Sequence, residues 1–330
     1  MLKSKKIIIL LAGRSAQRMI KLEKVSKTYR TGTFGGKLLP AVVDVSFDVR
    51  DGEVVSLIGE SGSGKSTIGK MILRLITITS GRILFNDIDI STIKKGDLKN
   101  YYHDVQSVFQ DPFSSYNPIF KADRIFSIIR QEFFPKVKDS QWNEKVDSSL
   151  KAVGLNPDQV LNKFPHQLSG GQLQRFLIAR ALLLDIKFLV ADEIISMLDA
   201  STRVDVLNLL AELKSKGLSI LFITHDLSLG YYISERAIIL YRGCIVEMGD
   251  TKKIYFDPIH PYTKMLMASV PRLDKKWEKV EVELKAKQAE ITEGCVYYER
   301  CKSPRRSTKC NLKRPDLVEV SPGHFASCFL

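Results

Sequence analysis

The sequence predicts an α/β fold built around a parallel sheet with helices on both faces. Residues 54–58 form a near-continuous apolar run, as expected of a buried parallel strand. Two further apolar runs, 186–191 and 219–224, flank a helical pattern over 202–214. A strand, a helix and a strand at this spacing predict a βαβ unit, and such units imply parallel strands.

The other elements follow from the same kinds of pattern. Residues 20–58 alternate short strand patterns with turns at Gly35-Gly36 and Asp51-Gly52, which predicts an antiparallel β subdomain at the N-terminal side. Helical spacing follows over 65–76. After a strand ending at 107–109, a proline-punctuated helical segment from about residue 111 to about residue 170 predicts an inserted helical subdomain.

The loop after the strand at 54–58 has the spacing of a phosphate-binding loop. It reads GESGSGKST, which matches G-x-x-x-x-G-K-[ST]. In this pattern the glycines let backbone N–H groups approach phosphate oxygens, the lysine reaches the β and γ phosphates, and the hydroxyl holds Mg²⁺. The following helix adds the positive end of its dipole. The predicted nucleotide-binding residues are Gly59, Glu60, Ser61, Gly62, Ser63, Gly64, Lys65, Ser66 and Thr67.

Two acidic residues and a histidine follow neighbouring strands of the predicted sheet. Asp192 and Glu193 end one apolar run, and His225 directly follows another. Ligands of open α/β sheets gather at the carboxyl ends of the strands. Because successive strand side chains point to opposite sides, we expect Asp192 to join Ser66 in holding Mg²⁺ and Glu193 to act as the base that orients water. Most isolated histidines are structural, but His225 is placed to donate to the γ phosphate.

A second anion site is predicted at LSGGQ, residues 168–172. Ser-Gly-Gly is by composition more often a turn, but a helical run over 172–184 follows it directly. Ser169, Gly170, Gly171 and Gln172 therefore form a helix N-terminus suited to a phosphate. It belongs to the helical subdomain and not to the first loop, so we expect it to complete the nucleotide site of another subunit.

Tyr29 precedes the phosphate loop and is a candidate to stack on a nucleotide base. A lone tyrosine is more often a packing residue. Its place in the order of motifs favours the base-stacking role.

These motifs, in this order, resemble the ATP-binding subunits of ABC transporters over nearly the whole chain. The resemblance implies a P-loop NTPase with a RecA-like core, ATP as the nucleotide, and a head-to-tail dimer in which LSGGQ of one subunit closes on the P-loop of the other. It also implies that Gln110 binds ATP, holds Mg²⁺ together with Ser66 and Asp192, and links this metal site to membrane subunits. Asp199 would belong to the D-loop, and His225 would be the switch histidine. In that family the Asp-Glu pair is usually followed by proline. Here Ile194 and Ile195 follow it, which leaves the path to Asp199 open.

A narrower resemblance rests on FPHQLSGGQLQR (164–175), HPYTKMLMASVP (260–271) and the cysteine-bearing tail. These segments are similar to the oligopeptide/dipeptide permease branch of importers. This branch implies uptake of peptides, nickel or oligosaccharides driven by ATP hydrolysis. The implied partners are a second ATPase, identical or a sister, two transmembrane permease subunits and, indirectly, an extracytoplasmic solute-binding protein. The implied location is peripheral, on the cytoplasmic face of the cell membrane.

Four tail cysteines invite a metal site. Five, eight and seventeen residues separate successive members, so the paired spacing of structural zinc is lacking. A reducing cytosol argues against disulfides. The alternatives are free cysteines in a flexible tail or a 4Fe-4S cluster held by all four thiolates, and the family resemblance supports the cluster. Cys244 is expected to be an ordinary strand residue. The candidate ligands are Cys295, Cys301, Cys310 and Cys328.

Length and composition suit one nucleotide-binding core with an appendage. The chain has 330 residues, and a single core stops growing near ~250 to 300 residues. We expect residues 1–18 to be a disordered extension, 19–258 the ATP-binding domain and 259–330 a C-terminal extension. No apolar run approaches the ~20 residues needed to cross a bilayer.

The net charge of +13 does not by itself indicate a partner, since scattered positive charge usually serves solubility. We therefore expect no nucleic acid. The alternative function is a soluble ABC ATPase acting on nucleic acid or the ribosome, for which the charge would matter. A regulatory ATP-binding subunit without hydrolysis is a third possibility, against which Glu193 and His225 argue.

Overall fold

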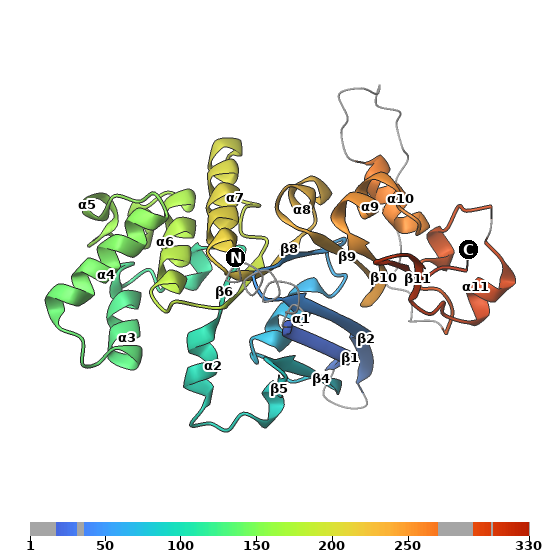
Figure 1. The fold of residues 1–330 in the computed structure, drawn as a ribbon, viewed down its shortest axis with the longest axis horizontal. Coiled ribbons are helices and arrows are strands. Elements are labelled where there is room, and N and C mark those ends of the chain that lie inside the picture. Colours follow the sequence, from blue (N-terminus) through green and yellow to red (C-terminus); the bar gives the residue numbers. More distant parts are fainter. Residues whose placement is uncertain (1–17, 32–35, 270–292, 305, 330) are drawn as a thin grey trace, which may run out of the picture.

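The computed structural model describes residues 18–31, 36–269, 293–304 and 306–329, and these contain two sheets (Figure 1). The smaller sheet has the strand order β2-β1-β4-β5, and all its pairs are antiparallel. This confirms the predicted N-terminal antiparallel subdomain. Its strands are β1 (Arg18–Thr31), β2 (Lys37–Arg50), β4 (Ser80–Phe85) and β5 (Ile88–Asp89).

The larger sheet has the order β11-β12-β10-β9-β3-β8-β7-β6. The strands from β9 to β6 in this order pair in parallel, which confirms the predicted parallel core. The other three strands extend it with antiparallel pairs, and two of them come from the C-terminal tail. The strands are β3 (Val54–Ile58), β6 (Val105–Val108), β7 (Phe188–Asp192), β8 (Ser219–Thr224), β9 (Arg236–Tyr241), β10 (Cys244–Asp250), β11 (Val318–Ser321) and β12 (His324–Ala326).

Helices cover both faces of this sheet and form a separate group at one end (Figure 1). The group at the end is built from α3 to α6, which lie in sequence between β6 and β7. No helix in the described ranges is long and apolar enough to cross a bilayer. The α-helices are α1 (Lys65–Ile72), α2 (Leu98–Asp104), α3 (Arg124–Phe133), α4 (Asp139–Ala152), α5 (Pro157–Val160), α6 (Gly170–Leu182), α7 (Ala200–Ser215), α8 (Leu227–Ile233), α9 (Thr251–Phe256), α10 (Pro261–Ala268) and α11 (Thr308–Leu312), and short 3₁₀ turns span Ile90–Thr92, Phe113–Ser115, Pro165–Gln167 and Tyr298–Arg300.

The central strands are buried on both faces, as their apolar runs predict. In β8, Ile220 and Phe222 pack in the cluster that includes α6 and α7, whereas Leu221 and Ile223 pack in the cluster that includes α1 and the smaller sheet. Side chains alternate across a strand, so each strand stabilises both layers. A third cluster joins β9 and β10 to α9, α10 and the tail residues Val296 and Tyr297.

Helix α1 is shorter than its apolar pattern over 65–76 predicts. It ends at Ile72 because Arg74 adopts a left-handed backbone with φ 54°, and the N–H of Leu75 bonds the carbonyl of Lys70 at 2.9 Å. This 6→1 bond with a left-handed residue is the Schellman way of closing a helix.

The expected N-terminal extension, residues 1–18, falls almost wholly outside the described residues. Its last member is an exception, because β1 begins at Arg18 and pairs there with Arg50. The strand therefore begins one residue before residue 19, the predicted start of the ATP-binding domain. Met19, the expected first residue of the domain, is buried in the core.

Candidate functional site

The phosphate loop connects β3 to α1, as its sequence predicts. Gly62 and Gly64 have φ values of 79° and 105°, a backbone that other residues rarely adopt. A side chain at Gly59 would place its Cβ 2.2 Å from the carbonyl oxygen of Leu240. The loop therefore needs these glycines, both for its own turn and for its close packing on β9.

Lys65 is the first residue of α1, and its buried ammonium group turns back into the loop. Its Nζ donates to the carbonyl of Gly59 at 2.8 Å and to that of Glu60 at 2.9 Å. Burial lowers the pKa of Lys65, while the carboxylates of Glu193, Asp192 and Glu60 oppose this shift. The loop thus holds a positive charge among backbone groups and facing acids, which is suitable for binding phosphate.

Ser66 and Asp192 meet at the proposed metal position. Ser66 Oγ donates to Oδ1 of Asp192 at 3.2 Å, although the two residues lie on α1 and β7. Burial raises the pKa of Asp192, and the hydrogen bond from Ser66 lowers it. A hydroxyl and a carboxylate are hard oxygen donors of the kind that Mg²⁺ takes together with substrate phosphates, so the pair fits that ion.

Glu193 and His225 also come together at the carboxyl ends of β7 and β8. Nδ1 of His225 lies 3.4 Å from Oε1 of Glu193. Glu193 is half-buried, and its backbone has φ 51°, held by a hydrogen bond from its N–H to the carbonyl of Ile223 at 2.9 Å. A strained backbone at such a position is a frequent feature of functional sites. The two carboxylates thus have different polar partners, Ser66 for Asp192 and His225 for Glu193.

The segment after Glu193, whose path the sequence left open, forms a tight apolar turn. Ser196 donates to the carbonyl of Glu193 through both its N–H, at 3.1 Å, and its Oγ, at 2.9 Å. Ile194 and Ile195, which stand where the family usually has proline after the acidic pair, are buried in the same hydrophobic cluster as the inner side chains of α7. The turn delivers Asp199 to the N-cap of α7, where hydrogen bonds from Ser201 and Thr202 lower its pKa.

Ser169 caps α6, as the motif predicts. Its Oγ accepts from the N–H of Gln172 at 3.1 Å, and Oε1 of Gln172 accepts from the N–H of Ser169 at 2.9 Å. This reciprocal capping box is visible in the sequence as S-x-x-Q. Gly171 packs against α7, because a Cβ there would lie 2.8 Å from Cγ2 of Thr202. Ser169 is exposed, so the helix N-terminus is open to a ligand from outside the chain.

Gln110 and Tyr29 lie away from these contacts. Gln110 follows β6 and is exposed, and no hydrogen bond among the described residues joins it to Ser66 or Asp192. Its neighbour Phe109 accepts a hydrogen bond at 3.4 Å from Nε2 of the buried Gln174, which connects this loop to α6. Tyr29 lies half-buried on β1 with Nζ of Lys27 at 5.2 Å from its ring centroid.

The four tail cysteines share one region but are not placed as a metal site. The N–H of Cys295 bonds the carbonyl of Cys310 at 2.7 Å. Burial raises the pKa of Cys328 to about 11, with Cys295, Cys301 and Cys310 adding to the shift. Within the described ranges, no group of three or more His, Cys, Asp or Glu side chains could hold a metal ion. The arrangement therefore does not support the predicted 4Fe-4S cluster. Cys244 is a buried residue of β10, as expected.

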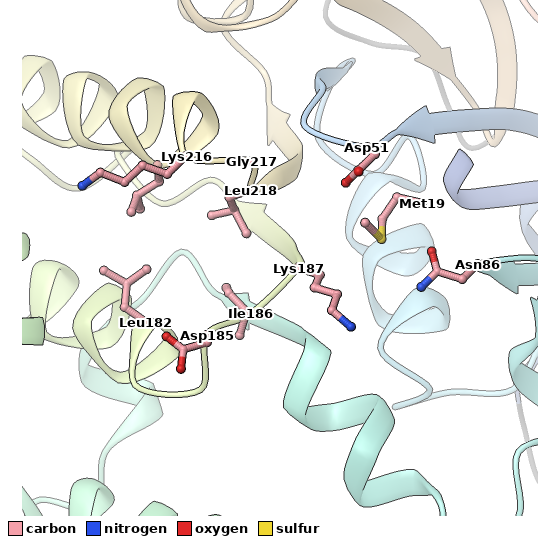
Figure 2. Close-up of a pocket in the computed structure, with 11 residues that line it drawn as sticks. Met19, Asp51, Asn86, Leu182, Asp185, Ile186, Lys187, Lys216, Gly217 and Leu218 are labelled. Carbon is pink, nitrogen blue, oxygen red and sulfur yellow. The ribbon is translucent and has the colours of Figure 1, made fainter. Parts of the chain in front are cut away.

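The pocket in Figure 2 is not part of this site. It has a volume of about 550 Å³ and opens at the amino ends of β7 and β8, where Lys187 and Leu218 lie (Figure 2). The phosphate loop, Asp192 and His225 all lie at the opposite, carboxyl ends of the parallel strands. Lys187 is paired with Asp104 at 2.7 Å, so its charge is already neutralised.

Sequence reasoning missed two residues that contact the phosphate loop from the C-terminal side. Tyr262 accepts a hydrogen bond from the N–H of Glu60, and Arg300 pairs with the Glu60 carboxylate. HPYT marked Tyr262 only as part of a motif, and no sequence pattern indicated Arg300.

Two protein-family models match segments of this chain. The family described as "ABC transporter" matches residues 42–196, and the one described as "Oligopeptide/dipeptide transporter, C-terminal region" matches residues 246–310. The oligopeptide transport ATP-binding protein AppF of Bacillus subtilis is 38% identical, with 97% of this chain and 99% of AppF covered.

Solved structures are also similar to this chain. The dimeric structure of MJ0796, a bacterial ABC transporter cassette, is similar with a TM-score of 0.64 and 30% identity, covering 71% of this chain and 99% of that one. Its dimeric post-hydrolysis state bound to ADP and Pi is similar to the same degree, at 29% identity.

Proposed function

The chain belongs to the ATP-binding subunits of ABC transporters, and from this premise we propose that it is the ATPase that drives a peptide importer. The observation that carries the proposal is the meeting of Ser66 with Asp192, and of Glu193 with His225, at the carboxyl ends of neighbouring parallel strands. The C-terminal match at 246–310 and the naming of AppF as an oligopeptide transport protein support peptides as the solute class.

Each residue of this site has its own role in phosphoryl transfer. The loop N–H groups and Lys65 hold the β and γ phosphates, and Ser66 with Asp192 would hold Mg²⁺, which neutralises phosphate charge when bound. Glu193 orients the attacking water and accepts its proton, and His225 donates to the γ phosphate. Positioning and charge neutralisation are most of the catalysis in this reaction class.

A second copy, or a sister ATPase, supplies what one subunit lacks. Ser169, Gly170 and Gly171 form an exposed helix N-terminus that no described contact joins to the P-loop of the same chain. We propose that it closes on the nucleotide held by a partner subunit. The two dimeric cassette structures support this arrangement.

We propose that the loop after Gln110 is the docking surface for the permeases. Four large apolar side chains are exposed between the start of this loop and the end of α3, and exposed apolar surface is a common feature of interaction sites. The chain would then lie on the cytoplasmic face of the membrane, bound to two permease subunits. An extracytoplasmic binding protein would deliver the solute to these permeases. The exposed apolar residues are Phe113, Ile119, Phe120 and Ile128.

We propose the domain division read from the sequence, with an ATP-binding domain over 19–258 and a C-terminal extension over 259–330.

The 4Fe-4S cluster stays a prediction, and no step of the proposed reaction depends on it. Iron and sulfide analysis of anaerobically purified protein tests it, and the absence of both elements would contradict it.

The variant Glu193→Gln tests the proposed function. It should bind MgATP, lose hydrolysis by about 100- to 1000-fold, and accumulate as an ATP-bound dimer in light scattering. Reconstitution with the permeases should then show peptide-stimulated hydrolysis by the wild-type protein only. Wild-type turnover in the variant, or a monomer at saturating ATP, would contradict the proposal.

A further inference from the structure

We infer that the C-terminal extension is a working part of the nucleotide site, and that Arg300 is a positioning residue which neutralises Glu60 and fixes the P-loop for triphosphate binding. This inference rests on the proposed function, since it concerns the same site. It adds a role for a residue far from every motif of the ATPase core.

Glu60, the second residue of the phosphate loop, is held at three points. Its carbonyl accepts from Nζ of Lys65 at 2.9 Å. Its N–H donates to Oη of Tyr262 at 3.0 Å. Its carboxylate accepts from Arg300, whose Nη1 lies 3.1 Å from Oε1 and 2.9 Å from Oε2, and whose Nη2 lies 3.1 Å from Oε1. The extension thus holds two of these points, and the catalytic lysine holds the third.

The guanidinium group of Arg300 also lies close to two aromatic rings. It lies 5.8 Å from the ring centroid of Tyr241 and 5.7 Å from that of Tyr297. The rings of Tyr241, Tyr262 and Tyr297 pack on one another, with centroids 4.5 to 5.4 Å apart. All three are buried. A cation between aromatic faces and a carboxylate fork has little freedom to leave.

This aromatic group is continuous with the strand that delivers the phosphate loop. Tyr241, Tyr262 and Tyr297 belong to the same buried cluster as Ile58, the last residue of β3. A displacement of the extension would therefore shift the strand end as well as the loop. Tight cores transmit such shifts, because packed side chains have few alternative arrangements.

Besides anchoring the loop, Arg300 neutralises the charge of Glu60. Glu60 is an acidic residue in a loop that must accept a strongly negative triphosphate. Burial opposes the charge of Arg300, but the hydrogen bonds that it donates to Glu60 and Tyr241 prevail and raise its pKa. The pair is only partly exposed, with 19% of the Arg300 and 39% of the Glu60 side chain accessible, so solvent screens the Glu60 charge incompletely. Without Arg300, that carboxylate would repel the nucleotide.

The experiment is a double-mutant cycle on the full chain, read by calorimetric MgATP binding and by the KM and kcat of hydrolysis. Arg300→Ala should weaken MgATP binding and raise KM by about tenfold, with kcat at saturation kept within about threefold, as expected of one unscreened charge near the ligand. Glu60→Gln should bind MgATP at least as tightly as the wild type. Glu60→Gln combined with Arg300→Ala should recover affinity to within about threefold of Glu60→Gln alone.

The readouts separate electrostatic positioning from mere anchoring. The affinity ratio between wild type and Arg300→Ala should narrow at high potassium chloride, because salt screens the Glu60 charge. Arg306→Ala is the matched control, since Arg306 lies in the same tail and stacks on Tyr298 at 4.0 Å. It should leave MgATP binding unchanged.

Three results would overturn the inference: unchanged MgATP affinity in Arg300→Ala, a loss in the double variant as large as in Arg300→Ala, or an equal loss in Arg306→Ala. If instead the wild-type protein itself fails to bind MgATP, the proposed function fails. The two failures are therefore distinguishable.

Discussion

Ser66 Oγ donates a hydrogen bond to Oδ1 of Asp192 at 3.2 Å, which joins the first turn of α1 to the end of β7. The phosphate loop and the acidic strand end are thereby parts of one site, although 126 positions separate the two residues. In the proposed function, these two residues would hold Mg²⁺ together.

The first prediction concerns the charge of Asp192. Asp192→Asn keeps an oxygen that can accept from Ser66 but removes the negative charge that Mg²⁺ needs. We expect kcat to fall by about 100- to 1000-fold, with a higher Mg²⁺ requirement in ATPase assays. Asp185→Asn is the matched control. Asp185 lies near the amino end of β7, away from the proposed site, so this variant should retain full activity. Equal Mg²⁺ dependence in wild type and Asp192→Asn would refute the assignment.

The second prediction separates two roles of Ser169. Ser169→Ala removes the acceptor for the N–H of Gln172 and should cost about 1 kcal/mol of stability. Ser169→Asn retains a good N-cap, so thermal unfolding should return close to the wild-type midpoint. If Ser169 also contacts a partner's nucleotide, hydrolysis should remain impaired in both variants. Recovery of hydrolysis along with stability in Ser169→Asn would limit Ser169 to capping.

The third prediction concerns the close packing of Gly171 on α7. In Gly171→Ala the new Cβ would lie 2.8 Å from Cγ2 of Thr202, which should force α6 and α7 apart and cost about 1 to 3 kcal/mol. Thr202→Ser removes this methyl group and keeps the hydroxyl that bonds Asp199 at 2.8 Å. Gly171→Ala combined with Thr202→Ser should therefore regain stability in thermal unfolding, and Thr202→Ser alone is the control. Equal destabilisation in the single Gly171 and the double variant would place the clash elsewhere.

The fourth prediction is a pH dependence of stability that originates at His260. Burial lowers the pKa of His260 from 6.5 to about 3, and its Nδ1 accepts from the N–H of Tyr262 at 3.1 Å. The unfolded chain then binds a proton that the folded chain refuses, so stability is full above pH 6.5 and is lost as pH falls toward 3. At about pH 5 the loss should be about 2 kcal/mol.

His260→Asn tests this dependence, because asparagine can cap the same helix without titrating. In denaturant unfolding near pH 7 and near pH 5, the difference between the two conditions should shrink in His260→Asn by about 2 kcal/mol. His166→Asn, at an exposed histidine, should keep the wild-type difference. An undiminished difference in His260→Asn would assign the acid sensitivity to other groups.

Much of the fold and site could be predicted because local sequence fixes it. The apolar runs gave β3 and β8 with their bounds, since strands buried on both faces need continuous apolar sequence. The glycines at 62 and 64 identified the phosphate loop, because other residues rarely adopt their backbone. Short patterns fail where the end of an element depends on one backbone turn, as at Arg74, and they cannot tell whether cysteines of one tail converge on a metal.

The sequence by itself determined the family chemistry: a P-loop lysine and serine, an acidic strand end, a histidine after the next strand and a capped glycine-rich helix start. Each is a local arrangement within a few residues, which backbone geometry and spacing specify directly. Only the tertiary structure decided that Arg300 reaches Glu60, a residue 240 positions earlier, and that Tyr262 holds the same loop. Such contacts depend on how the tail folds back onto β10 and packs with Ile58, and long-range packing of this kind leaves no periodic signal in the chain.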